Sequence, residues 1–395
     1  MLTMRQRIAV TTEIRYRYRK SIKKDKTSIL NEFVQTTGYN RSYARLILGS
    51  LKKTGRKRHS PPRKRKYDIL VFCQLKKLWV AADCICGQRL KPFLPELIDR
   101  LEHFGEIKLT KPVKKKLLAM GSATIDRLLS KTKKGCELKS KGKSTTKPGT
   151  LLKSLIVVRT YADWDDHRPG FFETDLVAFC GESVEGDYVN GLNLTDVNTG
   201  WVKLKAVMGK GQRGVHGAVN EARCELPFGM LGLDSDNGGE FINNILYRYC
   251  LENQISFTRI RANRKNDNCF VEQKNYTVMR RFLGYARYDA EEQRSIIKQL
   301  LPLVEDYVNF FSPSQKLKEK TRIGSRIKKQ YYQATTPYRK LLASGILEEE
   351  KRQRLTDYYE SLNPMELKRK INQFQKKLDK TLRWKINDLT NIDFR

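Results

Sequence analysis

The chain has 395 residues, 39% of them hydrophobic and 31% charged, which is enough for about two to four domains with real cores. Its 78 lysines and arginines outnumber its 43 aspartates and glutamates, so the formal net charge is +35. Because these basic residues occur along the whole chain, the charge favours nucleic acid as a partner over an anionic membrane or an acidic protein.

Membrane spans, secretion signals and metal-binding cysteine motifs are missing from the sequence. No stretch reaches the roughly 18 apolar residues that would cross a bilayer, and the N-terminus lacks the apolar run of a signal peptide. Among the eight cysteines only Cys84 and Cys86 lie close together, and none of the four histidines has metal-ligand spacing. We therefore expect reduced thiols, no zinc, no disulfide, and a cytoplasmic protein.

Residues 27–48 have the pattern of a helix, a tight turn and a second helix. Apolar residues fall on one face of each predicted helix, Gly38 permits the turn, and Asn40 can cap the second helix. The outward positions of that helix match those of a recognition helix and are Arg41, Ser42, Tyr43 and Arg45. Any helical hairpin with a glycine turn has this pattern, so plain packing stays open as the alternative to DNA reading.

A proline-broken basic run, residues 55–66, follows and includes Arg56, Lys57 and Arg58. It is either a solvated linker or a segment that tracks DNA phosphates, and the charge around it favours the second interpretation. We assign residues 1–66 to a helix-turn-helix DNA-binding region with this basic linker.

Residues 67–130 predict a second helical unit. The apolar spacing is helical over 67–104, and residues 112–129 again read as helix, glycine turn and helix. Residues 131–150 are rich in Lys, Ser and Thr, and we predict a flexible basic linker over 131–165.

From about Gly170 the apolar period becomes that of strands, which predicts a central α/β domain over 166–300. Strands are expected at 171–181, 187–196, 201–207, 228–235 and 256–260, with helices at 213–224, 240–253 and from Cys269. The region 301–395 is expected to be basic and mainly helical. Near its end, the apolar residues of 367–382 recur at helical spacing, typical of a helix that self-associates or packs beside DNA.

Three carboxylates lie where metal-dependent phosphodiester chemistry needs them. Asp175 lies inside an apolar strand, where an unpartnered carboxylate is costly, and Asp236 ends a second apolar strand before two glycines. Glu272 opens a helix, and 35 residues separate it from Asp236. Mg²⁺ prefers oxygen ligands, and two ions about 3.5–4 Å apart can activate the nucleophile and stabilise the leaving oxygen.

This triad and its spacing, with the Ser-Asp-Asn-Gly-Gly-Glu-Phe stretch at 235–241, resemble retroviral integrases and bacterial insertion-sequence transposases. The resemblance extends from roughly residue 28 to the C-terminus. It implies a ribonuclease H-like (integrase core) fold for 166–300, Mg²⁺ or Mn²⁺ held by Asp175, Asp236 and Glu272, and DNA ends as substrate. Enzymes of this family nick the end of a mobile element, and the exposed 3′-hydroxyl then attacks target DNA.

The resemblance also implies DNA contacts near the triad. Asn268, one helical turn before Glu272, matches a position where the family often has a polar DNA-contacting residue. Retroviral integrases carry lysines one and two turns after the glutamate, whereas this chain has Tyr276 and Met279, with its charge at Lys274 and at 280–281. Lys274 is therefore our expected DNA contact on this helix. The retroviral zinc module is absent, and the helix-turn-helix units replace it.

Several alternatives accompany this interpretation. Asp234 faces the same way as Asp236 on a strand, so only the family motif and its spacing favour Asp236. Glu173 shares a face with Asp175 and is expected to be an ion-pair partner or to support the ligands.

At the level of function, we expect a transposase that binds both ends of an element, associates with the nucleoid and forms a homo-oligomer on DNA. It would take no small-molecule substrate and no membrane partner. The alternatives are a structure-selective nuclease of the same fold, which the long N-terminal region disfavours, and an inactive DNA-binding regulator, which the intact triad disfavours.

Overall fold

The computed structural model describes residues 2–49, 66–133, 156–158, 168–261 and 268–390. The chain forms two compact units, Met1–Lys66 and Tyr67–Arg395. The regions expected at 67–130, 166–300 and 301–395 are therefore parts of one unit. No helix in the described ranges is both long enough and apolar enough to cross a membrane.

The first unit consists of three helices around a small apolar core. They are α1 (Met4–Lys20), α2 (Lys23–Thr37) and α3 (Arg41–Gly49). Gly38 ends α2 with a φ of 67°, a left-handed conformation that favours glycine, and donates its N–H to the Val34 carbonyl at 2.8 Å. The helix, turn and helix expected over 27–48 are confirmed, whereas α1 lies in a segment for which we predicted no element. It packs on α2 and α3 because its apolar residues complete a core around Phe33 and Leu48.

The second unit begins with four helices: α4 (Ile69–Ala81), α5 (Gly87–His103), α6 (Lys111–Leu118) and α7 (Ser122–Lys133). Leu75, Leu97 and Ile125 are fully buried among them, as the helical spacing predicts. Asp126 of α7 accepts a hydrogen bond from the Gly87 N–H at 2.9 Å, and this bond ties α7 to the start of α5.

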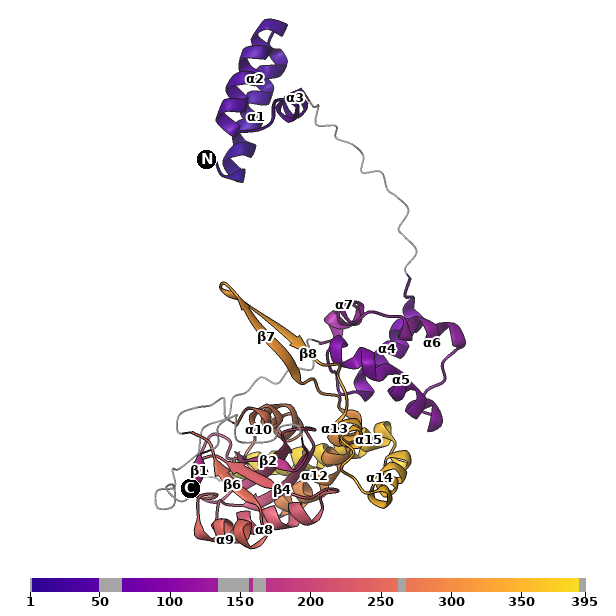
Figure 1. The fold of residues 1–395 in the computed structure, drawn as a ribbon. Helices are drawn as coiled ribbons and strands as arrows, with labels where there is room; N and C mark the ends of the chain where they lie inside the picture. Colours follow the sequence, from indigo (N-terminus) through magenta and orange to yellow (C-terminus); the bar gives the residue numbers. More distant parts are fainter. Residues whose placement is uncertain (1, 50–65, 134–155, 159–167, 262–267, 391–395) are drawn as a thin grey trace. The chain divides into compact units, whose positions relative to one another are not determined.

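A six-stranded mixed sheet follows these helices in the chain and lies among helices formed by residues 212–311 (Figure 1). Its strands are β1 (Val157–Val158), β2 (Phe171–Ala178), β3 (Val189–Asp196), β4 (Val202–Met208), β5 (Gly232–Ser235) and β6 (Ser256–Arg259). The spatial order is β1-β6-β5-β2-β3-β4, in which β2, β3 and β4 are antiparallel neighbours. The pairs β2–β5, β5–β6 and β1–β6 are parallel. The five strands that we expected are present, although β5 begins four residues later than predicted.

Helices on the faces of the sheet bury its apolar residues. They are α8 (Gln212–Cys224), α9 (Asn244–Glu252), α10 (Cys269–Lys274), the π-helical turn η2 (Asn275–Arg280), α11 (Arg281–Leu283) and α12 (Glu291–Phe311). Helix α12 packs on β4, where Asn309 accepts from and donates to the Val202 backbone at 2.9 and 3.0 Å.

The C-terminal region is mainly helical, as expected, but it also contains a hairpin that we did not predict. A second sheet, the antiparallel hairpin of β7 (Leu317–Ile323) and β8 (Arg326–Tyr331), precedes α13 (Pro337–Ala343), α14 (Glu349–Ser361) and α15 (Pro364–Thr390). Our interpretation of 367–382 as a helix for self-association or DNA packing is also corrected. Leu367, Ile371 and Leu378 are buried within the chain, because α15 lies along α12.

Candidate active site

Two aspartates meet where β2 and β5 run side by side. The parallel register pairs Glu173 with Asp234 and Thr174 with Ser235, so the next step along both strands brings Asp175 beside Asp236. Neighbouring strands lie about 4.8 Å apart, and β5 ends at Ser235, which leaves Asp236 at the edge of the sheet.

Asp234 occupies a different environment from Asp236. It is fully buried, and one of its carboxylate oxygens accepts a hydrogen bond from the Thr258 hydroxyl of β6 at 2.6 Å. Asp236 is half-buried, and its Oδ1 accepts from the Gly238 N–H at 2.9 Å. Of the two, Asp236 is the carboxylate that a substrate could approach, and this favours Asp236 over Asp234 as the second metal ligand.

Glu272 reaches the same region from α10, and Glu173 fixes the start of that helix. The backbone N–H groups of Phe270 and Val271 both donate to Oε2 of Glu173, at 2.8 and 3.0 Å. Glu173 is fully buried in β2, two residues before Asp175. A carboxylate at a helix N-terminus satisfies free N–H donors and complements the helix dipole. The strand that carries Asp175 therefore also holds the helix that carries Glu272.

A chain of amides orients Asp175. The side-chain amide of Asn275 donates to Asp175 Oδ2 at 2.6 Å, and its oxygen accepts from Asn193 at 2.8 Å. Asn193 lies directly opposite Asp175 in the β2–β3 register and accepts from the Thr195 hydroxyl at 3.2 Å. Asn275 begins the π-helical turn η2, a geometry that is frequent at functional sites.

The pKa of Asp175 is raised, in part by the other two carboxylates. Burial, followed by the charge of Asp236, raises the pKa of Asp175 to about 7, against the lowering effect of hydrogen bonds from Leu176 and Asn275. Glu272 adds a smaller increase. Burial also raises the pKa of Asp236, and Glu240 raises it further, whereas the Gly238 N–H and Lys210 lower it. Asp175 therefore senses both other carboxylates.

These residues fit a hard divalent cation by their chemistry. Carboxylate oxygens are the ligands that Mg²⁺ prefers. A cation between them would favour the charged form of Asp175, whose pKa is raised first by burial and then by the neighbouring carboxylates. Within the described ranges, no three His, Cys, Asp or Glu side chains are close enough to hold an ion as they stand. Glu272 is exposed on the first turn of α10.

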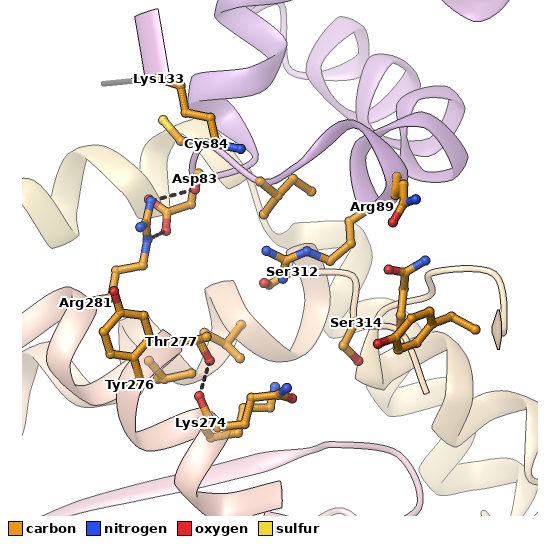
Figure 2. A pocket seen from close by; sticks show the side chains of 17 residues that line it. Asp83, Cys84, Arg89, Lys133, Lys274, Tyr276, Thr277, Arg281, Ser312 and Ser314 are labelled. Atoms are coloured by element: carbon orange, nitrogen blue, oxygen red, sulfur yellow. Dashed lines mark hydrogen bonds and ion pairs between the residues drawn. The ribbon is translucent and has the colours of Figure 1, made fainter. Parts of the chain in front are cut away.

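A basic cavity of about 530 Å³ adjoins the helix of Glu272 (Figure 2). Arg89 of α5 and Lys274 of α10 line it from facing elements, with Lys133 at the end of α7. Burial, together with Lys340 and Arg89, lowers the pKa of Lys274 to about 7. Arg281, also in the lining, is neutralised by an ion pair with Asp83. The cavity thus gathers cations whose mutual repulsion an anion would relieve.

The expected DNA-contacting residues have different surroundings. Arg41, Ser42, Tyr43 and Arg45 are all exposed on α3, whereas Arg56, Lys57 and Arg58 lie outside the described residues. Lys274 is half-buried in the wall of the basic cavity. Asn268 directly precedes α10 and is only 3% exposed. Its side chain therefore offers little surface for the direct DNA contact that we expected.

From the sequence we expect Glu173 to be an ion-pair partner or to support the ligands, and its hydrogen bonds to the start of α10 are of the second kind. No role was expected for Asn193, Thr195 or Asn275. One signal was available, because buried polar residues alternate in β3, at Asn193 and Thr195, in a strand whose positions are all buried. Buried polar groups need partners, so such a strand indicates a polar network.

Comparisons with known proteins give one relative in sequence. The uncharacterized protein y4rM of Sinorhizobium fredii (strain NBRC 101917 / NGR234) is 37% identical over 343 residues, which span 85% of this chain and 95% of that protein. No protein-family model matches the chain.

Two solved structures share a weak likeness with part of the chain. The catalytic core domain of BIV integrase is 17% identical, with a TM-score of 0.31, and covers 45% of this chain and 95% of its own. The HTLV-2 integrase catalytic core domain in complex with magnesium is 13% identical, with a TM-score of 0.28, over 37% of this chain and 90% of its own. At these TM-scores neither likeness establishes a shared fold.

Proposed function

We propose that this chain, which belongs to the same family as the uncharacterized protein y4rM, is a metal-dependent DNA transposase with a ribonuclease H-like core. It binds the ends of a mobile DNA element, cleaves them and joins them to target DNA. The observation that carries the proposal is the adjacency of Asp175 and Asp236 on parallel strands, with Glu272 on a helix that Glu173 caps.

In the proposed site, Asp175, Asp236 and Glu272 would hold divalent cations. Two such ions would supply the Lewis acidity that activates the attacking oxygen and offsets charge on the transferred phosphate. Asn275 fixes the position of the Asp175 carboxylate by donating to its Oδ2. The Gly238 N–H does the same for Asp236 through Oδ1.

DNA binding is assigned to basic surfaces outside the triad. Exposed residues of α3 would read or grip DNA from the first unit. In the second unit, the basic cavity with Arg89 and Lys274 would accept a phosphate of the bound strand. Since two element ends must be brought together, the active form is proposed to be a homo-oligomer on DNA.

A strand-transfer assay tests the proposal. Labelled duplexes from the DNA that flanks the gene on both sides are incubated with Mg²⁺, a supercoiled target plasmid and the full chain. We expect joined products with the wild type and none with Glu272→Gln, while both proteins bind the duplexes equally. Glu252→Gln is the matched control, because it removes one carboxylate from an exposed position on α9 and should join normally.

Other outcomes would replace the proposal. Binding without nicking or joining in the wild type would point to a DNA-binding regulator. Nicking of branched or hybrid substrates without joining would point to a structure-selective nuclease. Joining by Glu272→Gln at the wild-type rate would remove Glu272 from the site.

A further inference from the structure

The β7–β8 hairpin is a two-stranded ribbon that no other described segment buries on either face. Every residue from 317 to 333 is exposed, and in Figure 1 the ribbon extends as a long arm away from the six-stranded sheet. An isolated two-stranded hairpin is only marginally stable in water. A chain that retains such an arm gains little from it unless something else packs against it.

The arm is strongly basic. Residues 317–331 contain six cations and one carboxylate, that of Glu319; the cations are Lys318, Lys320, Arg322, Arg326, Lys328 and Lys329. Glu319 accepts a hydrogen bond from the Thr321 hydroxyl at 2.9 Å. In the part of the chain that the structure describes, no salt bridge involves any of these six cations. Their charge therefore has no counterpart there.

The strand register increases this imbalance. Lys320 lies directly opposite Lys329, and residues directly opposite share one face of the ribbon. Like charges in such a pair destabilise a sheet. Arg322 follows on the same face, while Lys328 and Arg326 lie on the other. Cations thus cover both faces, whereas a membrane-binding ribbon would have one apolar face.

The tip of the arm is apolar in part. Ile323 is 66% exposed and Ile327 is 51% exposed, on either side of a turn in which Gly324 has a φ of 59°. The register pairs Ile323 with Arg326 and Arg322 with Ile327, so each face ends in one isoleucine beside one arginine. Apolar side chains flanked by arginines suit contact with base edges between two phosphate backbones.

We propose that the β7–β8 ribbon is a second DNA-binding surface, which lies in a groove of duplex DNA with its cations against the phosphates on both sides. The major groove, about 12 Å wide, admits a two-stranded ribbon. The proposal rests on the proposed function for one point, the choice of DNA as the polyanion that binds the ribbon. Its test involves no catalysis.

The test measures how the full chain binds a fluorescent random-sequence duplex over a range of salt concentrations. The ribbon variant is Lys320→Gln/Lys328→Gln/Lys329→Gln. Its matched control removes three exposed lysines from α15, as Lys376→Gln/Lys377→Gln/Lys380→Gln. Each phosphate contact contributes about −0.9 to the slope of log K against log salt. We expect the ribbon variant to bind about 10- to 100-fold more weakly at moderate salt, with a slope smaller by about 2 to 3, and the control to bind far closer to the wild type.

A third variant protects the test against misfolding. Replacing the same three ribbon lysines by arginine keeps the charge and should restore both the affinity and the slope. An equal loss in the ribbon variant and the α15 control would show that only net charge matters, and would overturn the proposal. So would a ribbon variant that aggregates or changes its self-association while binding DNA normally, because its lysines would then protect strand edges or form an interface between copies.

Failure of the ribbon and failure of the proposed function give different results. If the wild type joins DNA ends and the ribbon variant still binds like the wild type, only the ribbon proposal is lost. If binding depends on the ribbon but the wild type neither nicks nor joins, the ribbon proposal stands and the transposase proposal falls.

Discussion

The six-stranded sheet and the β7–β8 ribbon both carry ionisable side chains on their strands, but only the sheet surrounds them with protein. In the sheet, Glu173 is fully buried and accepts two backbone N–H bonds, and Asp175 accepts from Leu176 and Asn275. On the ribbon, Lys320 and Lys329 lie opposite each other in solvent, and no acidic side chain within the described ranges forms a salt bridge with either.

This difference separates two kinds of functional charge. Charges held by buried hydrogen bonds have fixed positions, which chemistry on a phosphate requires. Charged side chains on an exposed ribbon remain mobile, and their contribution to binding depends on how many there are and on their sign. This suits contact with a DNA backbone. The comparison predicts large effects on catalysis from single changes in the sheet and small ones from single changes on the ribbon.

The largest expected effect comes from removing one carboxylate of the triad. Asp175→Asn, Asp236→Asn and Glu272→Gln should each lower strand cleavage by about 10²-fold or more, because bound metal ions contribute several kcal/mol to such reactions. Cleavage of labelled DNA ends in Mg²⁺ measures this. Asp234→Asn is the informative control, since an amide can still accept from Thr258 and cleavage should continue. The reverse result, with Asp234 required and Asp236 dispensable, would reassign the second ligand.

A smaller effect is expected at Glu173, a positioning residue that caps α10. Glu173→Ala leaves the N–H groups of Phe270 and Val271 without their acceptor and should lower the free energy of unfolding by about 2 kcal/mol. Glu272 would then be held less firmly, so cleavage should need a higher Mg²⁺ concentration. Urea denaturation and Mg²⁺ titration of the cleavage rate measure the two effects.

Glu173→Gln separates support of the site from plain stability. It keeps one carbonyl oxygen as acceptor and should restore most of the Mg²⁺ response. If Glu173→Ala loses stability but cleaves with an unchanged Mg²⁺ dependence, the cap is structural only.

The sequence could predict the parts of this site that depend on local patterns, but not those that depend on residues far apart in the chain. The strands β2 to β6 have alternating or continuous apolar patterns, which are local, and the triad was found through its family spacing. The Glu173 cap joins residues 97 and 98 positions apart, and Asn275 lies 100 positions from Asp175. No local pattern encodes such pairs, because each depends on how the helix docks on the sheet.

The ribbon was not predicted because its strands lack the local pattern by which strands are recognised. Strands are recognised by apolar alternation, yet both faces of β7 and β8 are exposed and mostly charged, so no such alternation exists. The apolar stripe of α15 was recognised as a helix, but its partner α12 could not be inferred, because a stripe fits another copy of the chain as well as its own core.

The raised pKa of Asp175 predicts that both protein stability and Mg²⁺ binding depend on pH, with effects of intermediate size. Its folded-state value of about 7 lies above the ordinary 3.8, so without metal the stability of the protein should fall as the pH rises from about 4 to about 7. Divalent ions bind the carboxylate form and must displace its proton below that pH, which should weaken Mg²⁺ binding by up to about tenfold per pH unit. Titration calorimetry at pH 6, in two buffers that differ in ionisation enthalpy, counts the released protons. Release that persists in Asp175→Asn would assign the proton to another group.

The smallest predicted effect concerns the ribbon itself. Lys329→Gln removes the repulsion with Lys320 and should stabilise the hairpin by about 0.2 to 1 kcal/mol, an effect that salt should diminish. Amide hydrogen exchange of the peptide over 317–331, followed by mass spectrometry without DNA, measures this stability. Lys318→Gln is the matched control, because Lys318 lies at the irregularity of β7 and has no cross-strand partner. Equal exchange rates in the two variants would mean that the lysine pair is already screened. The repulsion between Lys320 and Lys329 would then not weaken the hairpin, although the ribbon would keep its net positive charge.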